Sequence, residues 1–332
     1  MRKVRVGLVG CGTVFRTHLQ QLREMKEIEI AAVCDIDESK RLPDCGFYTD
    51  YHEMARQETL DAVHICLPHY LHEDAARTFA AAGIAVLCEK PVGMNLEQCA
   101  RMAQLEQQYG VMVAVCMQNR WNRTFCRLQE LLREPESGKL LGIKAIAAWN
   151  RTLEYYQASP WRGEMAHAGG GCMMNQAVHT LDLMLCLGGE VASVSGQICR
   201  LSGYPIEVED TACASITFAN GCKGLFFGSV VNASNASIEI EVYCEHVTYC
   251  IKDYTLWRSA PGSSDRERIL SDDVLAETKA YYGAGHRALI HDFYRALAGA
   301  GGHYVTVESA SRVIRLIEDI GKSSARQAAV EF

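Results

Sequence analysis

The sequence predicts an α/β protein that begins with a doubly wound parallel sheet and continues into a second domain. Three observations support this prediction. Short apolar runs alternate with helical stretches through about the first 120 residues, and such alternation is typical of a parallel sheet. A glycine turn, Gly10-Cys11-Gly12, directly follows the first apolar run. After residue 190, extended runs are separated by short turns such as Asn220-Gly221, which predicts antiparallel hairpins.

Length and composition narrow the class of protein. The 332 residues correspond to about two domains at roughly 150 residues each, and 48% of them are hydrophobic, so each domain can bury a core. The 33 basic and 40 acidic residues give a net charge of −7, which argues against a surface that binds DNA or RNA. No apolar run approaches the ~18 residues of a membrane span. We therefore expect a soluble protein with neither a nucleic-acid partner nor a membrane partner.

The cysteines predict the compartment. The chain has fifteen of them, an odd number, and no C-x-x-C pair. Their neighbours are mostly apolar, as in Val33-Cys34 and Leu87-Cys88, which is typical of small buried side chains. We expect reduced thiols in a cytoplasmic protein and no metal site, because a zinc or disulfide framework would need clustered spacing.

The first two apolar runs have the spacing of a dinucleotide-binding unit. Residues 4–9 form a strand-like run that ends at Gly10, and a helical pattern follows the turn. The second run, residues 28–34, ends in Asp35, twenty-three residues after Gly12. The two glycines permit a tight turn and the close approach of a pyrophosphate to a helix N-terminus. Asp35 is placed to accept hydrogen bonds from the adenosine ribose hydroxyls.

The third glycine of this motif is absent. The positions after Gly12 read Thr13, Val14 and Phe15, and we expect Phe15 to widen the contact between the helix and the first strand. Asp35 bears on the choice of cofactor, because a 2′-phosphate about 4 Å from a carboxylate is repelled by ~4 kcal/mol at an effective dielectric constant of ~20. We therefore predict NAD in preference to NADP.

Functional groups in a doubly wound sheet lie beyond the carboxyl ends of its strands. Further strand-like runs occupy residues 62–66, 85–89 and 111–118, and helical stretches occupy 73–82 and 96–109. The residues at these ends are Leu67, Pro68, His69 and His72, then Glu89 and Lys90, then Asn119 and Arg120. His69 and His72 are interpreted as loop histidines near the cofactor.

From about residue 120 the pattern changes. Residues 174–187 predict one helix in which Asn175, His179 and Asp182 stand at i, i+4 and i+7, so that their side chains share a face. The other predicted helices are 124–133, 286–298 and 308–325, and the extended runs are 143–150, 191–200, 211–218, 223–231 and 237–251.

Taken in order, these motifs resemble the Gfo/Idh/MocA oxidoreductases. The resemblance covers essentially the whole chain and rests on Gly10-Cys11-Gly12 with His18, Cys66-Leu67-Pro68 with His72, Glu89-Lys90-Pro91, Gly169-Gly170-Gly171 through Asp182, and Tyr282-Gly283 with Gly285-His286 and Asp292-Phe293. It implies an N-terminal Rossmann domain (residues 1–120) and a C-terminal α/β domain (residues 121–332). The second domain would carry a large, mostly antiparallel open sheet. In this family such a sheet commonly mediates oligomerisation, so a homodimer or homotetramer is expected.

The chemistry implied by this resemblance is hydride transfer from a secondary alcohol to a nicotinamide. His179 suits the role of base because its unperturbed pKa lies near working pH. The Lys90 cation suits the stabilisation of alkoxide character on the reacting oxygen. Similar polyol dehydrogenases carry Asp four residues before the catalytic His, whereas this chain has Asn175, which cannot accept a proton. Asp182 is a possible assistant to His179 or an intrahelical contact.

The predicted site residues fall into three sets. The catalytic set is Lys90, His179 and Asn175. The cofactor set is Gly10, Gly12, Thr13, Val14, Asp35, Leu67, Pro68, His72, Glu89 and Lys90. The substrate set is Lys90, Arg120, Tyr156, Trp161, Arg162, Asn175 and His179. The pairs Tyr155-Tyr156 and Trp161-Arg162 suit a platform for a sugar ring bearing hydroxyls or an acid group, and they suit packing at a domain edge equally well.

Three functions remain open at this point. The first is an NAD-dependent dehydrogenase acting on a sugar, sugar derivative or cyclitol. The second uses tightly bound NAD for transient oxidation and elimination, and so cleaves or epimerises a glycoside without net redox change. The third is a catalytically silent NAD-binding regulator, which would be expected to lack Lys90 and His179.

Overall fold

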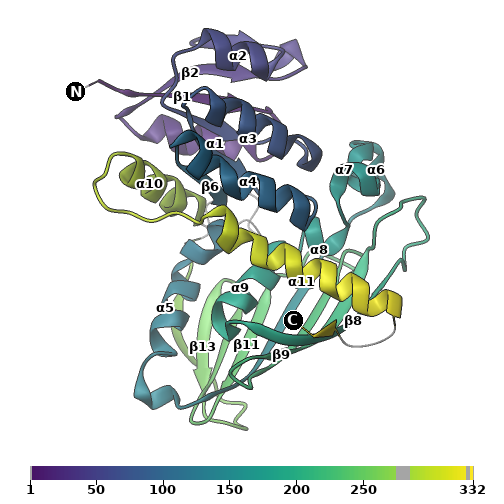
Figure 1. Ribbon diagram of the computed structural model, residues 1–332. Helices are drawn as coiled ribbons and strands as arrows, with labels where there is room; N and C mark the ends of the chain where they lie inside the picture. The colour runs from purple at the N-terminus through teal and green to yellow at the C-terminus, as the bar shows by residue number, and fades with distance from the viewer. Residues whose placement is uncertain (1, 274–284, 327–329, 332) are drawn as a thin grey trace. The chain divides into compact units, whose positions relative to one another are not determined.

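The computed structural model describes residues 2–273, 285–326 and 330–331. The chain forms two units, one of Met1–Met117 with His286–Ser311 and one of Gln118–Gly285 with Arg312–Phe332 (Figure 1). The chain first crosses between units within three residues of the boundary expected at residue 120. The return of 286–311 to the first unit was not anticipated, because no linker composition marks its ends. The Tyr282-Gly283 motif lies outside the described residues.

The first unit is a Rossmann-type unit. Over the described residues its parallel sheet has six strands in the order β3-β2-β1-β4-β5-β6. Its strands are β1 (Val4–Val9), β2 (Ile28–Cys34), β3 (Gly46–Tyr48), β4 (Ala62–Ile65), β5 (Ala85–Glu89) and β6 (Val113–Cys116). Its helices are α1 (Phe15–Glu24), α2 (Tyr51–Gln57), α3 (His72–Ala81), α4 (Leu96–Tyr109) and α10 (Gly285–Leu297), with 3-10 turns at Glu38–Lys40 and His69–Leu71.

The central strands are buried along their whole length, which explains their nearly continuous apolar sequence. Helix α4 has clear boundaries, because Asn95 accepts a hydrogen bond from the Gln98 amide at 2.9 Å and Gly110 ends the helix at φ 66°. The predicted bounds of β5 and α4 are confirmed. Strand β3 and helix α2 were not predicted, because β3 has only three half-buried residues at a sheet edge.

The second unit contains the larger sheet. Within the described part of the chain this sheet has nine strands in the order β14-β13-β12-β11-β7-β10-β9-β8-β15, and all neighbours are antiparallel except β7 and β10. The strands are β7 (Leu140–Ala148), β8 (Val191–Cys199), β9 (Thr211–Phe218), β10 (Lys223–Ser229), β11 (Glu239–Cys244), β12 (Thr248–Lys252), β13 (Thr255–Ser259), β14 (Glu267–Ser271) and β15 (Val330–Glu331).

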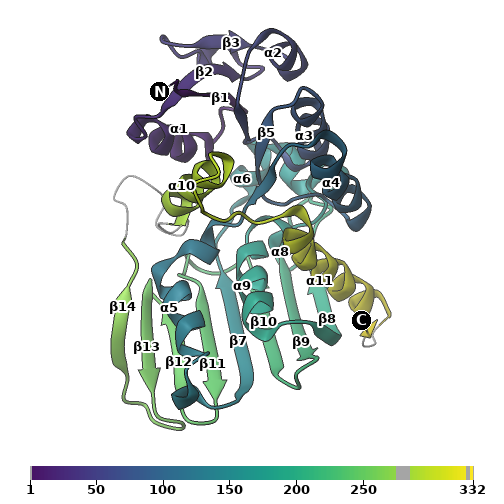
Figure 2. The same ribbon diagram turned by 60° about the vertical axis from the view of Figure 1, so that its left-hand side comes forward.

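Helices cover one face of this sheet (Figure 2). They are α5 (Arg123–Leu131), α8 (Cys172–Asn175), α9 (Val178–Gly188) and the C-terminal part of α11 (Val307–Arg326). The covered face carries Phe226, Ile240 and Val242, each at most 3% exposed. The Ser323 hydroxyl of α11 accepts a hydrogen bond from the Gly196 amide of β8 at 3.0 Å, which fixes the helix against the sheet. The opposite face bears no helix of this unit among the described residues.

The prediction of one helix over residues 174–187 was wrong. The segment forms two helices, α8 and α9, with Gln176 and Ala177 between them. The Ala177 amide reaches back five residues to the Cys172 carbonyl at 2.7 Å, and this wider turn interrupts the helical repeat. Asn175 and His179 therefore do not belong to one helical face.

Candidate active site

The glycine turn of the first unit has two glycines with different roles. Gly10 has φ 86°, and a Cβ there would lie 2.7 Å from the Cys66 carbonyl oxygen, so the fold itself requires glycine. A Cβ on Gly12 would meet nothing within 4 Å. Helix α1 begins next, and its cap residue Val14 makes no side-chain capping hydrogen bond. The open space at Gly12 beside uncapped helix amides fits a bound pyrophosphate.

Asp35 is tied to this turn. One carboxylate oxygen accepts a hydrogen bond from the Cys11 amide at 2.6 Å, and the other accepts one from the Asp37 amide at 2.9 Å. The side chain remains half-buried and retains acceptor capacity for ribose hydroxyls. Burial, followed by the Asp35 charge, raises the pKa of the Cys11 thiol to about 12, so this thiol stays protonated. Phe15, at the missing glycine position, is 6% exposed.

The loops after β4 and β5 are held together by His72. Its Nε2 lies 2.8 Å from the Leu67 carbonyl oxygen and its Nδ1 lies 2.8 Å from the Pro91 carbonyl oxygen. The ring is fully buried, and this burial lowers the pKa of His72 although both carbonyls favour the cation. His72 thus positions the Leu67-Pro68 and Lys90-Pro91 segments rather than facing solvent. Lys90 is half-buried at the end of β5.

Glu89, the last residue of β5, ends a chain of buried hydrogen bonds. His18 Nε2 of α1 is 2.9 Å from Glu89 Oε1, and His18 Nδ1 is 2.8 Å from His64 Nδ1 of β4. His64 Nε2 is 2.8 Å from the Tyr294 hydroxyl of α10. The second Glu89 oxygen accepts a hydrogen bond from the Lys90 amide at 3.3 Å. Glu89, predicted to contact cofactor, is only 4% exposed and supports Lys90 from below.

The same carboxylate faces two further buried groups. His286 Nε2 of α10 lies 3.7 Å from Glu89 Oε1, and ligand-type atoms of His18, Glu89, Cys116 and His286 lie within 4.8 Å of one another. A proton already joins His18 to Glu89 at hydrogen-bond distance, and a metal ion would have to displace it. We therefore interpret the group as a hydrogen-bonded cluster.

Burial and charge compete within this cluster. Burial alone would raise the pKa of Glu89, but the hydrogen bond from His18 and the nearby His286 outweigh it and hold that pKa well below its usual value. Burial, with the neighbouring His18, lowers the pKa of His64 well below 6.5. Burial also lowers the pKa of His286, although Glu89 opposes this shift. In the folded protein, burial thus favours the neutral form of His64 and His286, while Glu89 favours the charged form.

In the second unit, His179 lies in the first turn of α9. It is 7% exposed, and its Nε2 lies 3.1 Å from the Gln118 amide nitrogen. An amide nitrogen can only donate, so this contact occupies the Nε2 lone pair and favours the tautomer with hydrogen on Nδ1. Gln118 begins the 3-10 turn Gln118–Trp121, which also carries Asn119 and Arg120, and sequence reasoning missed it because no motif includes it.

Asn175 and Gln176 both contact one tyrosine. Their side-chain amides donate hydrogen bonds to the Tyr155 hydroxyl oxygen, each at 3.1 Å. Tyr156, the tyrosine predicted to bind substrate, is instead 6% exposed and packs with Ala168 and neighbouring apolar residues. Tyr155 is therefore the member of the pair that lies beside Asn175. The sequence could not tell adjacent tyrosines apart without the direction of helix α6 (Leu153–Gln157).

Arg120 and Asp182 form a buried ion pair. Arg120 Nε and Nη2 donate to the two Asp182 oxygens at 2.8 and 2.6 Å, and the Asp182 side chain is 2% exposed. Burial would lower the pKa of Arg120, and Asp182 more than offsets this effect and raises it. Arg120, which was predicted to bind substrate, is thus paired with Asp182, which was considered as an assistant to His179. This bidentate pair joins the turn after residue 117 to α9.

Glu209, which sequence reasoning missed, anchors the triple-glycine segment. Its carboxylate accepts hydrogen bonds from the Gly171 amide at 2.7 Å and the Met173 amide at 3.0 Å. A Cβ on Gly171 would lie 1.7 Å from the Glu209 carbonyl oxygen, so glycine is obligatory for this close approach. Burial raises the pKa of Glu209, and the amide hydrogen bonds oppose this rise. The contact fixes the start of α8 and hence Asn175.

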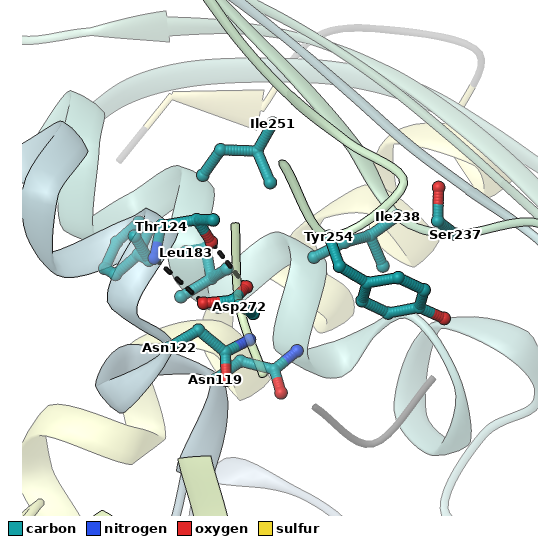
Figure 3. A pocket seen from close by; sticks show the side chains of 10 residues that line it. Asn119, Asn122, Thr124, Leu183, Ser237, Ile238, Ile251, Tyr254 and Asp272 are labelled. Atoms are coloured by element: carbon teal, nitrogen blue, oxygen red, sulfur yellow. Dashed lines mark hydrogen bonds between the residues drawn. The ribbon is translucent and has the colours of Figure 1, made fainter. Parts of the chain in front are cut away.

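A small pocket in this unit borders the turn that carries Asn119 (Figure 3). Its lining includes Asn119, Asn122, Leu183, Tyr254 and Asp272. Asp272 accepts hydrogen bonds from the Thr124 amide at 2.9 Å and the Thr124 hydroxyl at 2.6 Å. These bonds hold the N-terminus of α5, and with it the turn that positions Gln118 and Arg120. The pocket contains none of the predicted catalytic residues.

A parallel sheet of this order, with an open glycine turn and Asp35 at the end of its second strand, defines a dinucleotide-binding protein of the Rossmann class. Residues 4–117 match the model of an oxidoreductase family with an NAD-binding Rossmann fold, and residues 125–250 match the GFO/IDH/MocA C-terminal domain. The chain belongs to the Gfo/Idh/MocA oxidoreductase family, which confirms the resemblance found in its motifs.

Named relatives include several dehydrogenases. The chain is 28% identical over 194 residues to the rhizopine catabolism protein MocA of Rhizobium meliloti, covering 57% of this chain and 59% of that protein. It is 25% identical over 253 residues to myo-inositol 2-dehydrogenase of Thermotoga maritima, covering 72% of each. The WlbA dehydrogenase from Bordetella pertussis, solved with NADH and UDP-GlcNAcA, matches with a TM-score of 0.86 at 25% identity over 100% of this chain and 99% of that one.

The match to MocA thus spans less than two thirds of that relative. None of the described helices combines the length and apolarity needed to cross a lipid bilayer.

The buried histidines predict an acid-sensitive fold. His64 and His286 stay neutral in the folded protein, whereas in the unfolded chain they bind protons near pH 6.5. The unfolded state therefore holds more protons, and the free energy of unfolding falls as pH drops below 6.5, by up to ~1.4 kcal/mol per pH unit for each group. The depressed pKa of Glu89 adds a loss in the same direction below about pH 4.5.

Urea unfolding between pH 8 and pH 5 measures this slope. The His64→Gln variant should be less stable at pH 8 and show a shallower dependence on pH. The exposed His246 provides the matched control, and His246→Gln should keep the wild-type slope. Equal slopes for wild type and His64→Gln would contradict the assignment of a neutral buried His64.

Proposed function

We propose that this protein is an NAD-dependent dehydrogenase that oxidises a secondary hydroxyl of a sugar, sugar derivative or cyclitol. The observation that carries the proposal is the way in which Lys90 is held at the nucleotide-binding edge of the first unit. Its amide donates a hydrogen bond to Glu89, and His72 contacts the carbonyls of Leu67 and Pro91 in the adjoining loops. The names of the relatives support the class of substrate, since one is a myo-inositol dehydrogenase and another was solved with a nucleotide sugar acid.

The proposed roles follow from the groups themselves. His179 removes the hydroxyl proton through Nε2, where the substrate hydroxyl takes the place of the Gln118 amide. The Lys90 ammonium donates to the reacting oxygen as alkoxide character develops. Asn175, whose amide also donates to Tyr155, binds a neighbouring hydroxyl by hydrogen bonding, since an amide cannot take the proton itself. Bound NAD would supply the hydride acceptor.

The residues that would hold NAD are those of the glycine turn and the strand ends. Gly10, Gly12, Thr13 and Val14 form the phosphate turn, and Asp35 would accept from the adenosine ribose. We propose NAD over NADP because the Asp35 carboxylate would repel a 2′-phosphate. The fifteen free thiols support a reducing, cytoplasmic setting for the enzyme.

Activity tests this proposal. Purified protein incubated with NAD and a panel of inositols, aldoses and sugar acids should produce NADH absorbance. Lys90→Met and His179→Asn should each lower kcat by about 10²–10⁴-fold, because each removes a group that acts on the hydroxyl. Lys26→Met, at an exposed lysine of the same unit as Lys90, should leave kcat unchanged.

Silence across the panel would contradict a net dehydrogenase. If the purified protein also carried NAD that did not exchange and released an aglycone without net NADH, the transient-oxidation version would replace it. Unchanged kcat in Lys90→Met would remove Lys90 from the chemistry.

The open space at Gly12 provides a test of cofactor binding that does not need a substrate. Gly12→Ala should retain the thermal stability of wild type, because its Cβ meets nothing within 4 Å, and should weaken NADH binding at least about tenfold. Gly321→Ala, at an equally open glycine in α11, should leave NADH affinity unchanged. Fluorescence titration with NADH and NADPH measures both this effect and the predicted preference for NADH. Full NADH affinity in Gly12→Ala would contradict the assigned phosphate turn.

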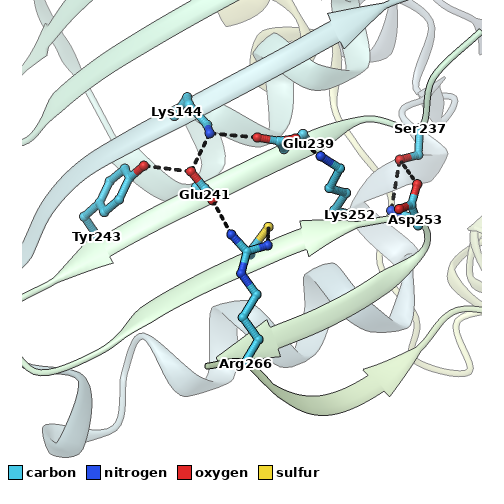
Figure 4. A network of polar contacts seen from close by, with 9 residues as sticks. Lys144, Ser237, Glu239, Glu241, Tyr243, Lys252, Asp253 and Arg266 are labelled. Carbon is cyan, nitrogen blue, oxygen red and sulfur yellow. Dashed lines mark hydrogen bonds and ion pairs between the residues drawn. The ribbon is translucent and has the colours of Figure 1, made fainter. Parts of the chain in front are cut away.

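We also propose that the uncovered face of the large sheet pairs with a second copy of the chain. Three large apolar side chains on this face are exposed, namely Leu225 at 60%, Phe227 at 42% and Tyr243 at 40%. Beside them Lys144 binds Glu239 at 2.7 Å and also binds Glu241 (Figure 4). Lys252 and Arg266 complete the network on the same two carboxylates. A face that combines apolar side chains with satisfied charges of both signs suits a symmetric interface.

Sedimentation velocity tests the interface. Wild type should sediment as a dimer or tetramer at micromolar concentration, and Phe227→Asp should shift it towards monomer because the new charge would be buried against its partner. Leu201→Asp alters a side chain that is 66% exposed outside the sheet strands and should leave the oligomer intact. A monomeric wild type, or an oligomer unaffected by Phe227→Asp, would contradict this interface.

A further inference from the structure

A cluster of aromatic rings and guanidinium groups lies next to Asn175 in the second unit. Arg162 Cζ is 4.3 Å from the centre of the Tyr155 ring and 5.7 Å from that of Trp161. Arg151 Cζ is 5.2 Å from the centre of the Tyr155 ring and 5.1 Å from that of Trp149. Tyr155 therefore contacts two cations with its ring, while its hydroxyl contacts the Asn175 amide.

The cluster is built on its own apolar core. Tyr156, Ala168, Ile206 and Val208 are each at most 6% exposed, and Tyr155, Trp161 and Tyr204 pack against them. A Cβ on Gly163, the residue after Arg162, would lie 2.8 Å from Ile206, so the backbone here is closely packed. This packing orders the side chains of Tyr155 and Trp161 before any ligand binds.

Arg162 has donors that the described part of the protein leaves unused. Its Nη1 donates to the Tyr155 carbonyl at 3.1 Å, and no described carboxylate lies within ion-pair distance of it. Two acidic side chains nearby in sequence have other partners, since Glu164 pairs with His167 and Glu207 accepts a hydrogen bond from the Met165 amide. A guanidinium that lies over an aromatic ring can still offer its remaining N–H donors to a planar oxyanion.

The Tyr155 hydroxyl adds a donor to this edge. Its oxygen already accepts hydrogen bonds from Asn175 and Gln176, which occupies both lone pairs. Its own hydrogen is then directed away from those amides. Tyr155 thus connects Arg162, which has no carboxylate partner among the described residues, to Asn175, which lies four residues before His179.

We propose that this cluster binds an acidic group of the substrate, so that the enzyme acts on an anionic carbohydrate in preference to its neutral counterpart. Arg162 binds the oxyanion, Tyr155 donates a hydrogen bond beside it, and Arg151 adds positive charge. This inference rests on the proposed function and specifies its substrate class. A carboxylate and a phosphate present the same oxyanion chemistry, and the experiment separates them.

Calorimetric titration of the NADH-saturated protein tests the proposal with three matched pairs. These are glucuronate with glucose, glucose 6-phosphate with glucose, and UDP-N-acetylglucosaminuronate with UDP-N-acetylglucosamine. The acidic member of at least one pair should bind at least about tenfold more tightly, and added salt should reduce this difference. The pair that shows the difference identifies the anion as a carboxylate or a phosphate.

Variants connect the preference to the cluster. Arg162→Gln should weaken binding of the acid by about 10–100-fold, because it removes the positive charge that hydrogen-bonds the oxyanion. NADH binding should be unchanged, because Arg162 is not among the residues proposed to hold the cofactor. Arg162→Lys keeps the charge without the planar fork and should give an intermediate loss. Arg133→Gln, which removes an exposed positive charge elsewhere, should have no effect.

Each outcome is decisive. Equal binding of acid and neutral members, absence of binding by every acid, or unchanged acid binding in Arg162→Gln would overturn the proposal. If Arg162→Gln did not fold, the wild-type comparison together with Arg162→Lys would decide. NADH formation from neutral sugars without a preference for acids would overturn this inference alone, whereas Arg162-dependent acid binding without NADH formation would overturn the dehydrogenase and leave the subsite.

Discussion

The first unit depends on the burial of one carboxylate. Glu89 is 4% exposed at the end of a central strand, where an unpaired charge would cost several kcal/mol. Its donors must therefore come from other elements of the same unit. His18 supplies one from α1, and His286 approaches from α10. This requirement gives a physical reason why a segment near the C-terminus returns to the nucleotide-binding unit.

The hydrogen-bond chain behind Glu89 has one direction when its imidazoles are neutral. The carboxylate can only accept, so His18 Nε2 donates to it and His18 Nδ1 accepts from His64. His64 Nε2 then accepts from the Tyr294 hydroxyl. One anion at the end of the chain therefore sets the tautomer of two histidines. In this arrangement every ring nitrogen of the two histidines has a hydrogen-bond partner.

This arrangement also explains the position of Lys90. Lys90 directly follows Glu89, the last residue of β5, so the buried Glu89 fixes where the Lys90 backbone lies. The Lys90 amide bonds the same carboxylate, and His72 fixes the loop that follows at Pro91. Lys90, to which we assign a role in the chemistry, is thus held by two buried residues.

Local sequence patterns predicted much of this fold. The bounds of β5 and α4 were readable because a short apolar run and a capped amphipathic helix are determined by neighbouring residues. The glycine turn was readable for the same reason, since backbone geometry demands Gly10. The break between α8 and α9 could not be predicted from the sequence, because it depends on a backbone hydrogen bond from Ala177 that reaches back five residues instead of four.

The site residues, too, could be predicted where neighbouring residues determine them and not where distant contacts do. The positions of Lys90 and His179 on their elements follow from motifs, but the partners of Arg120 and Glu89 lie 62 and 71 residues away in sequence. Charge alone does not indicate whether an arginine meets a ligand or a buried aspartate. The choice between Tyr155 and Tyr156 depends on which side of a five-residue helix faces Asn175, and such a short helix has no periodicity to reveal it.

The most informative departure from the family pattern is Asn175. An aspartate at this position could only accept, and the Tyr155 hydroxyl would then donate its hydrogen inward to the carboxylate. The asparagine amide reverses that hydrogen bond, because its nitrogen donates to the Tyr155 oxygen, and Gln176 does the same. The phenol hydrogen is therefore free to turn towards a ligand. With an asparagine here in place of an aspartate, the Tyr155 hydrogen joins Arg162 as a second donor, and such a pair suits the proposed oxyanion better than a neutral hydroxyl.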